Sequence, residues 1–284
     1  MCGIIAYLGF SDAFTYCLNG LIQLQNRGYD SAGISSIIDS KYIISKYASF
    51  ENISALDKIK KEKELHNNSN IAIGHTRWAT HGAKTDKNSH PHFSNDGVFC
   101  LVHNGIIENY AEIKKFLLEQ DFVFKSETDT EVIVNLLSFY YLRLNDVMKS
   151  LKETLDKLEG TWGLVIMCIN EPDKLYTVRR GSPILIGKSQ KHIIITSEQS
   201  GFCNQVENYF ILQNNDICCI EKGKELIINT NEQYPLRKIN KGKFIASPEP
   251  WEHWTIREIY EQTESVLRAI SQGARLLFNG KVKL

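Results

Sequence analysis

The segment that decides the fold stands at the start of the chain, where residues 1–8 have the sequence MCGIIAYL. An apolar run of this length, followed by Gly9, predicts a short strand over residues 2–8. Its first residue, Cys2, becomes the chain terminus when the initiator Met1 is removed. Cys2 then carries both a thiol and an α-amine, whose reference pKa of about 7.7–8.0 lies near neutral pH. Such an amine can act as general base for its own side chain, so Cys2 is a candidate nucleophile; the alternative is an accidental cysteine.

Outward from this strand, apolar periodicity divides the rest of the chain into strands and helices. Strands are expected at residues 34–38, 42–47, 71–76 and 98–103 and again between 161 and about 228, and helices at 12–25, 51–65, 108–119, 129–142 and 146–158. Strands followed by helices and then by more strands favour an α+β layered domain over a doubly wound one. We place this domain at residues 1–240. Residues 241–284 are expected to form a linker and an amphipathic helix over 255–272, which docks on further domains or on a second copy of the chain.

The composition is that of an ordinary globular protein. The 284 residues are 43% hydrophobic, and 33 basic and 33 acidic side chains give a formal net charge of zero. A neutral chain is a poor nucleic-acid binder, and no apolar run approaches the roughly 20 residues that span a membrane. With no secretory signal, seven cysteines and no Cys-x-x-Cys pair, we expect a cytoplasmic protein with free thiols. His90-Pro91-His92 has no further ligand at a familiar spacing, so neither a metal nor another cofactor is expected.

Two segments carry side chains suited to acyl transfer. Asn104-Gly105 directly follows the strand expected at 98–103. It offers a side-chain NH2 group and an unhindered backbone N–H, which together can hold an oxyanion. The alternative is a plain turn, because Asn-Gly is a strong turn signal. Arg77, just past the strand at 71–76, can bind a carboxylate through two parallel hydrogen bonds, or it is an ordinary surface arginine.

A third segment is acidic and opens a helix. Residues 126–131 have the sequence Ser-Glu-Thr-Asp-Thr-Glu. One interpretation is capping, since acidic side chains are favourable at a helix N-terminus. The other is that one carboxylate turns inward to hold the ammonium group of a ligand. A nucleophile with its own base, an oxyanion hole, a carboxylate clamp and an ammonium acceptor together imply attack on the side-chain carbonyl of a free amino acid.

These residues also carry a resemblance to a known family. The segments concerned are Met-Cys-Gly-Ile-Ile at the start, Asn-Arg-Gly-Tyr-Asp-Ser-Ala-Gly at 26–33, Gly-His-Thr-Arg-Trp-Ala-Thr-His-Gly at 74–82, Asn-Ser-His-Pro-His at 88–92, His-Asn-Gly-Ile-Ile-Glu-Asn at 103–109 and Ser-Glu-Thr-Asp-Thr-Glu at 126–131. In identity and order they resemble the class II glutamine amidotransferases. Among these, the chain looks most like the glutaminase domain of the glutamine–fructose-6-phosphate aminotransferases, also called glucosamine-6-phosphate synthases. The resemblance covers essentially the whole chain.

The resemblance implies an N-terminal-nucleophile fold, in which two antiparallel sheets lie between helix layers. It implies a glutaminase that hydrolyses L-glutamine through a Cys2 thioester. The ammonia would serve sugar-phosphate isomerase domains, in cis or in trans, that convert fructose 6-phosphate to glucosamine 6-phosphate. The implied site residues are Cys2 as nucleophile, Asn104 and Gly105 as oxyanion hole, Arg27 as support beside Cys2, Arg77 for the substrate carboxylate, Asp129 for its ammonium group, Thr80 and His81 in the glutamine loop, Trp78 as a gate for ammonia and His90 as pocket support.

Three departures from the family pattern stand beside this resemblance. Glu198 occupies a position that is commonly Asp, and Thr263 one that is commonly Pro. The sequence stops at Leu284, where the family begins its isomerase domains, so the chain is a fragment, an expressed domain or a separate subunit, and it can form a homodimer. Two other functions stay open at this point. They are a related amidotransferase with another acceptor, and a catalytically silent glutamine-binding regulatory module.

Overall fold

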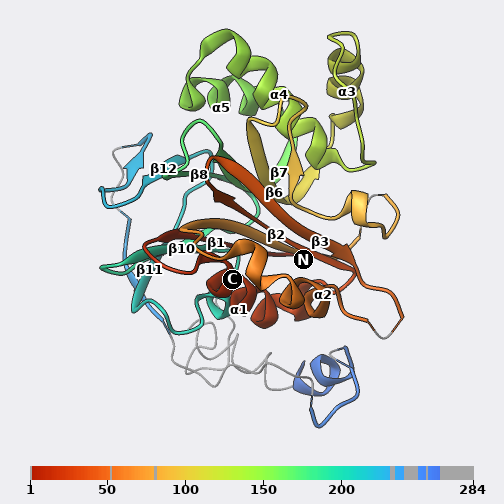
Figure 1. Ribbon diagram of the computed structural model, residues 1–284, viewed down its shortest axis with the longest axis vertical. Helices are drawn as coiled ribbons and strands as arrows, with labels where there is room; N and C mark the ends of the chain where they lie inside the picture. Colours follow the sequence, from red (N-terminus) through yellow and green to blue (C-terminus); the bar gives the residue numbers. More distant parts are fainter. Residues whose placement is uncertain are drawn as a thin grey trace, which may run out of the picture. The chain divides into compact units, whose positions relative to one another are not determined.

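The computed structural model describes residues 2–51, 53–79, 82–230, 234–239, 249–253 and 255–262. The chain divides into two compact units, Met1–Gly242 and Lys243–Leu284. In the first unit, two antiparallel sheets are stacked on each other and helices cover their outer faces (Figure 1). The predicted α+β layered architecture is therefore confirmed for this unit.

The two sheets differ in size. The eight-stranded sheet has the order β14 (Arg237–Lys238), β11 (Asn208–Ile211), β9 (Leu185–Lys188), β10 (His192–Thr196), β1 (Gly3–Gly9), β4 (Ile71–Arg77), β2 (Ser31–Ile38) and β3 (Lys41–Ala48). The six-stranded sheet has the order β13 (Ile227–Ile228), β12 (Ile217–Glu221), β8 (Lys174–Arg180), β7 (Gly160–Cys168), β6 (Phe99–Ile107) and β5 (His92–Phe93). The strand at the start of the chain, β1, thus lies in the interior of the larger sheet, where both of its edges are paired.

Helices cover the outer face of each sheet. The larger sheet is covered by α1 (Ala13–Leu24) and α2 (Ala55–Lys61), and the smaller by α3 (Tyr110–Leu118), α4 (Asp129–Leu144) and α5 (Val147–Leu155) (Figure 1). Asp12 caps α1 by accepting a hydrogen bond from Thr15 N at 3.0 Å, as its position ahead of the apolar run predicts. The helix expected over residues 51–65 corresponds to α2, which begins later, at Ala55, because Ser54 supplies its N-cap.

The period of two along each strand decides which side chains enter the space between the sheets. In β1, Ile4, Ala6 and Leu8 lie in the core between the sheets, whereas Ile5 and Tyr7 pack on α1. The same alternation places Ile71 and Ile73 of β4, and Cys100 and Val102 of β6, between the sheets. When every second residue is followed further along these three segments, the next positions on the same face are Cys2, His75, Arg77 and Asn104. All four therefore belong to the face that lies between the sheets.

The strand expected to end at His103 continues four residues further. β6 spans Phe99–Ile107, and in it Asn104 pairs with Gly163 and Gly105 with Trp162 of β7. The prediction of a stop at Asn104-Gly105 is wrong, and so is the plain-turn alternative. A long apolar partner strand decided the outcome, since β7 offers a continuous ladder that overrides the local preference of Asn-Gly for a turn.

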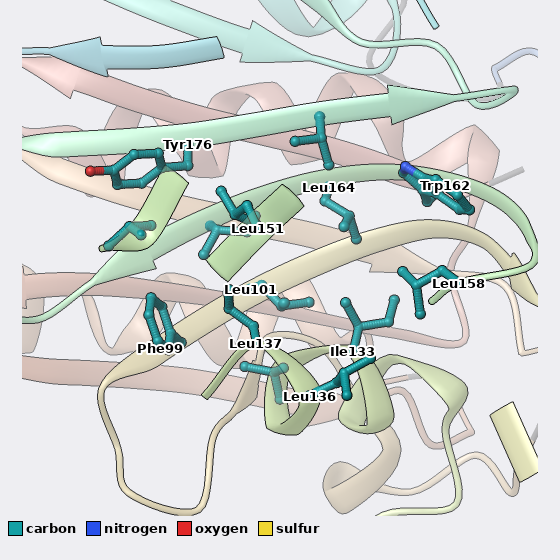
Figure 2. Close-up of a cluster of buried hydrophobic side chains, with 14 of the residues drawn as sticks. Phe99, Leu101, Ile133, Leu136, Leu137, Leu151, Leu158, Trp162, Leu164 and Tyr176 are labelled. Atoms are coloured by element: carbon teal, nitrogen blue, oxygen red, sulfur yellow. The ribbon is translucent and has the colours of Figure 1, made fainter. Parts of the chain in front are cut away.

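The packing of α4 on β6 fixes the position of the acidic segment. Leu101 of β6 and Ile133 and Leu137 of α4 are fully buried in one cluster (Figure 2). Burial of three such side chains contributes roughly 5–9 kcal/mol before conformational entropy is counted. Because these contacts hold α4 against the strand, its first residue, Asp129, is brought beside the end of β6.

The second unit is described for residues 249–253 and 255–262. Residues 255–262 are helical, as predicted, and the Trp251 and Tyr260 rings stack with centroids 4.2 Å apart. The expected continuation of this helix to residue 272 lies outside the described residues, as do Thr263 and most of the expected linker. Within the described part of the chain, no helix is both long and apolar enough to cross a membrane.

Candidate active site

The start of β1 is held by side chains from both neighbouring strands. Gly3 N donates to Thr76 Oγ1 at 3.2 Å, and Ile4 N donates to Ser197 Oγ at 2.9 Å. Cys2 Sγ accepts a hydrogen bond from Trp78 N at 3.2 Å and lies 3.6 Å from Trp78 O. These contacts hold the Cys2 thiol against the end of β4 and anchor the backbone of the two residues that follow it.

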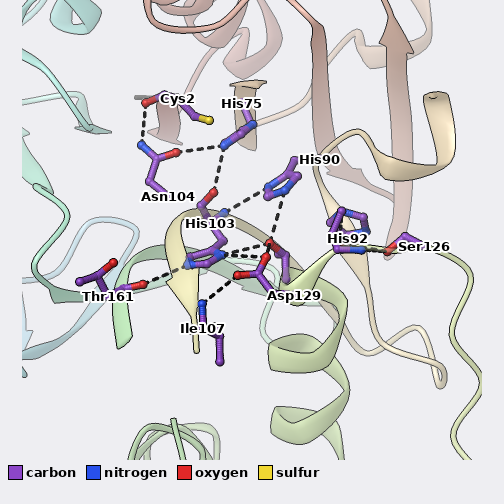
Figure 3. Close-up of polar contacts among 12 residues, drawn as sticks. Cys2, His75, His90, His92, His103, Asn104, Ile107, Ser126, Asp129 and Thr161 are labelled. Carbon is purple, nitrogen blue, oxygen red and sulfur yellow. Dashed lines mark hydrogen bonds and ion pairs between the residues drawn. The ribbon is translucent and has the colours of Figure 1, made fainter. Parts of the chain in front are cut away.

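Asn104 links the smaller sheet to Cys2. Its Nδ2 donates to Cys2 O at 2.7 Å, and its Oδ1 lies 3.0 Å from His75 Nε2 (Figure 3). His75 comes from β4 and Cys2 directly precedes β1, so segments from both sheets meet at this amide. The NH2 group that sequence analysis identified as an oxyanion donor therefore lies next to the candidate nucleophile.

Gly105 has a backbone conformation that other residues rarely adopt, with φ +141°. A Cβ atom at this position would lie 2.0 Å from Thr161 O and 2.9 Å from His103 Nε2. A contact of 2.0 Å with a backbone oxygen cannot be relieved by a side-chain rotation. Glycine is therefore required here both by its dihedral angle and by the approach of β7.

Two cavities meet at Cys2. The smaller, of about 40 Å³, is lined by Cys2, His75, Arg77, Trp78, His90, His103, Gly105, Thr128, Asp129 and Thr130. The larger, of about 400 Å³, is lined by Cys2, Arg27, Asn104, Gly105, Ile106, Thr161, Ser182, Pro183, Ser197 and Glu198. Eight of the ten residues predicted for the site line one or both cavities. The other two, Thr80 and His81, lie outside the described residues.

Asp129 faces the small cavity from the first residue of α4. Its Oδ2 accepts a hydrogen bond from Ile107 N at 2.9 Å, and its Oδ1 lies 4.0 Å from His103 Nδ1. Neither contact is a helix cap, and Thr128 at the N-cap makes no side-chain capping bond. The neighbouring Glu131 instead satisfies the backbone ahead of the helix, accepting from Lys125 N at 2.8 Å. One carboxylate of the acidic segment thus turns toward the cavity, while another satisfies the backbone ahead of the helix.

Four buried imidazoles lie beneath the site, on His75, His90, His92 and His103. Burial lowers the pKa of all four, that of His75 to about 3, so they are neutral at pH 7. The rings of His75 and His90 stack with centroids 4.1 Å apart. Among the described residues, no group of three His, Cys, Asp or Glu side chains is arranged to hold a metal ion.

The loop that carries His90 and His92 is fixed by groups that sequence analysis did not single out. Lys46 Nζ donates to Ser89 O at 2.9 Å and to Pro91 O at 3.1 Å. A partly buried lysine bound to two carbonyls has no signature in a single sequence. His75 and His103, by contrast, could have been found from the sequence. His75 stands two residues before Arg77, on the same face of a strand, and His103 stands directly before Asn104.

Two predicted residues lie at the rim. Arg27 pairs with Glu198, and both side chains are about one-third exposed. Trp78 is 46% exposed, and its ring meets that of Tyr29 edge-on with centroids 5.5 Å apart. Glu198, which departs from the family pattern, therefore supplies a carboxylate to Arg27 beside the larger cavity.

The thiol of Cys2 is poorly activated by its surroundings. Burial raises its pKa, an effect only partly opposed by the hydrogen bond from Trp78 N. A neutral thiol needs a base at the moment of attack, and the buried histidines are held in hydrogen bonds to other groups. The chemistry that fits this arrangement is nucleophilic attack by Cys2, with its own amine as base and Asn104 and Gly105 facing the developing charge.

Comparison with known proteins shows a consistent set of relatives. The model of the glutamine amidotransferase domain family matches residues 75–204. A probable glutamine–fructose-6-phosphate aminotransferase (isomerizing) of Acanthamoeba polyphaga mimivirus is 41% identical over 278 residues, covering 96% of this chain and 45% of that protein. The enzyme of the same name from Pyrococcus horikoshii is 35% identical over 274 residues, covering 95% and 45%. The chain spans less than half the length of these relatives.

Solved structures show the same fold. The glutamine phosphoribosylpyrophosphate amidotransferase from B. subtilis, complexed with ADP and GMP, superposes with a TM-score of 0.65 at 23% sequence identity, over 85% of this chain and 50% of that one. A structure described as the allosteric regulatory enzyme of purine biosynthesis gives a TM-score of 0.66 at 23% identity, with the same coverage. The predicted sandwich of two antiparallel sheets between helix layers is confirmed.

Proposed function

Since this chain belongs to the glutamine amidotransferase family, we propose that residues 1–240 form a glutaminase domain that hydrolyses L-glutamine to glutamate and ammonia. The observation that carries the proposal is the contact of Asn104 Nδ2 with the backbone of Cys2 at 2.7 Å. It joins a nucleophile to an oxyanion donor across two sheets. This contact holds a side-chain NH2 group beside Cys2, and acyl transfer requires a donor of this kind next to the nucleophile.

The reaction begins at the Cys2 thiol once Met1 has been removed. The α-amine takes the thiol proton, directly or through a water, and the sulfur attacks the amide carbon of glutamine. The carbonyl oxygen becomes an oxyanion that is stabilised by Asn104 Nδ2 and Gly105 N. Collapse of this intermediate breaks the C–N bond, and the protonated α-amine returns its proton to the departing ammonia. A γ-glutamyl thioester on Cys2 remains.

Water completes the cycle. The α-amine, again neutral, takes a proton from a water molecule that attacks the thioester, and the same two donors hold the second oxyanion. Collapse releases glutamate and restores the thiol. The larger cavity is lined by Cys2, Asn104 and Gly105, and in this proposal it supplies the water that attacks the thioester.

The small cavity holds the amino-acid end of glutamine in this proposal. Arg77 binds the α-carboxylate, Asp129 binds the α-ammonium group, and His90 lines the pocket. Thr80 and His81, which lie outside the described residues, are assigned to the glutamine loop by the resemblance alone. The cavity is narrow, with a volume of about 40 Å³. In this proposal Trp78, nearly half-exposed at the rim, gates the departure of ammonia, and Arg27 supports the site beside Cys2.

The acceptor of the ammonia is inferred from the names of the relatives. They are aminotransferases of fructose 6-phosphate, and more than half of each relative lies outside the part that this chain matches. We propose that this chain works with sugar-phosphate isomerase domains, in cis or in trans, to make glucosamine 6-phosphate. Residues 241–284 lead toward those domains or toward a second copy of the chain.

Glutamate release tests the proposal directly. The purified chain, with its N-terminus confirmed by mass spectrometry, is compared with Cys2→Ala and with Cys203→Ala as a matched control. Cys203 is the other cysteine that is neither fully buried nor disulfide-bonded. The proposal expects glutamate from the native chain and from Cys203→Ala, and none from Cys2→Ala. Equal release by all three chains, or none from the correctly processed native chain, would contradict it.

A further inference from the structure

We propose that His75 is a positioning residue, which holds the side-chain amide of Asn104 in the one orientation that turns its NH2 group toward Cys2. The inference rests on the proposed function, because it assigns Asn104 its part in the glutaminase reaction. His75 itself touches no reacting atom in this scheme. It acts through Asn104, to which its Nε2 is bonded at 3.0 Å.

The hydrogen-bond pattern leaves one assignment of protons. His75 Nε2 lies 3.0 Å from His103 O as well as from Asn104 Oδ1. A backbone carbonyl only accepts, so Nε2 must carry the proton. A protonated Nε2 requires an acceptor from Asn104, and the acceptor of a carboxamide is its oxygen. Oδ1 therefore faces His75, and Nδ2 faces Cys2, whose backbone oxygen accepts from it at 2.7 Å (Figure 3).

The opposite orientation of the amide is strongly disfavoured. It would place an NH2 group against the Nε2–H of His75, and Oδ1 against Cys2 O. Two favourable contacts would become two repulsive ones in a buried setting, where such pairs are poorly screened. Without His75, only the contact with Cys2 O would distinguish the two orientations of the amide, so one of the two interactions that favour the observed orientation would be lost.

His75 is itself well fixed. It is 1% exposed, it pairs with Ile4 across the β1–β4 ladder, and its ring stacks on that of His90. His90 is held in turn, because its Nδ1 accepts from His103 N at 3.4 Å. Burial also lowers the pKa of His75 to about 3, so the ring stays neutral and keeps a single donor at Nε2 over the working range of pH.

A double-mutant cycle with four chains tests this inference: the native chain, His75→Leu, Asn104→Ala and the double variant. Leucine keeps most of the volume of the ring and removes the donor. We expect His75→Leu to lower kcat for glutamate release about 10- to 100-fold with KM changed less than threefold, within the 10²–10³-fold loss expected of Asn104→Ala. In the Asn104→Ala background, the same substitution is expected to change kcat less than threefold.

Two further variants separate positioning from structure. His75→Gln can replace the donor with its own side-chain NH2 group, so we expect kcat within about fivefold of the native value. His66→Gln is the matched control, because His66 is fully buried, bonded to Ser36 and Ser45, and distant in sequence from Asn104. It is expected to lower thermal stability without changing kcat.

The outcomes are decisive in each direction. Loss of activity by His75→Leu that persists undiminished in the Asn104→Ala background would overturn the inference, since His75 would then act by another route. A native chain that releases no glutamate would instead refute the proposed function, and the inference would be decided by nitrogen NMR of the His75 ring. A proton on Nε2, with a resonance that shifts in Asn104→Ala, supports it. A proton on Nδ1, or a resonance indifferent to Asn104, overturns it. The same spectra decide the matter if His75→Leu fails to fold.

Discussion

Replacing Gly105 by alanine perturbs the proposed oxyanion hole without removing any side-chain hydrogen bond. The added Cβ would lie 2.0 Å from Thr161 O and 2.7 Å from Thr161 C, so the β6–β7 ladder has to open locally. The positive φ of Gly105 adds about 1–3 kcal/mol of backbone strain. We expect the free energy of unfolding to fall by about 2–4 kcal/mol, which a domain of this size survives.

The catalytic effect should exceed what the loss of stability explains. Displacing the Gly105 N–H from the oxyanion is expected to lower kcat by about 10²–10³-fold, the usual cost of one such donor. Gly160→Ala is the matched control, because its φ is +120° and its Cβ would lie 2.2 Å from Ile106 O in the same ladder. Gly97→Ala isolates the strain of a positive φ, since nothing lies within 4 Å of its Cβ.

The assay measures glutamate release and urea unfolding for all three variants, at a temperature where each is folded. We expect similar losses of stability for Gly105→Ala and Gly160→Ala, a smaller loss for Gly97→Ala, and a large loss of kcat for Gly105→Ala alone. Equal losses of kcat in Gly105→Ala and Gly160→Ala would refute the reasoning, because distortion of the ladder would then account for both.

Three other predictions follow from the site and its surroundings. Arg77→Lys should lower kcat/KM for glutamine about 10- to 100-fold, chiefly through KM, because an ammonium group cannot make the bidentate contact; an unchanged KM in steady-state kinetics would remove Arg77 from the carboxylate site. Burial lowers the pKa of His66 to about 4, so the unfolded chain binds one more proton than the folded chain between pH 4 and 6.5, and the free energy of unfolding falls by about 3 kcal/mol as the pH falls through that range. His66→Gln should reduce the slope of the free energy of unfolding against pH, measured by urea unfolding, by about 1.4 kcal/mol per pH unit; equal slopes in the two chains would contradict this. A chain that keeps Met1 should fold normally and release no glutamate, because its Cys2 nitrogen is an amide; activity in a chain shown by mass spectrometry to be unprocessed would contradict the role of the amine.

Much of the fold followed from local sequence. The strands expected at residues 34–38 and 42–47 are present as β2 and β3, and the two residues that join them, Asp39 and Ser40, adopt the positive φ of a two-residue hairpin. The helix expected over residues 12–25 is likewise present as α1, Ala13–Leu24. These features depend on residues within a few positions of each other, which a single sequence contains.

The features that sequence reasoning missed depend on contacts between distant segments. The extension of β6 through Asn104 and Gly105 needs the ladder with β7, which lies about 60 residues later. The donor on His75 and the contacts of Lys46 with two backbone carbonyls were not predicted, because each depends on a partner from a distant segment of the chain. Cys2 and Asn104 were each identified as candidate site residues from the sequence, whereas the contact that joins them could not be derived from spacing.

Covalent trapping on Cys2 tests the central claim most directly. The processed chain is incubated with a glutamine analogue that carries an electrophile in place of the side-chain amide, with and without excess L-glutamine, and is then mapped by peptide mass spectrometry. The other six cysteines are internal controls, five of them buried and Cys203 partly exposed. The account predicts one adduct, on the Cys2 peptide, that L-glutamine prevents. An adduct on Cys203, or labelling of Cys2 that L-glutamine leaves unchanged, would contradict the claim that Cys2 is the nucleophile of a glutamine site.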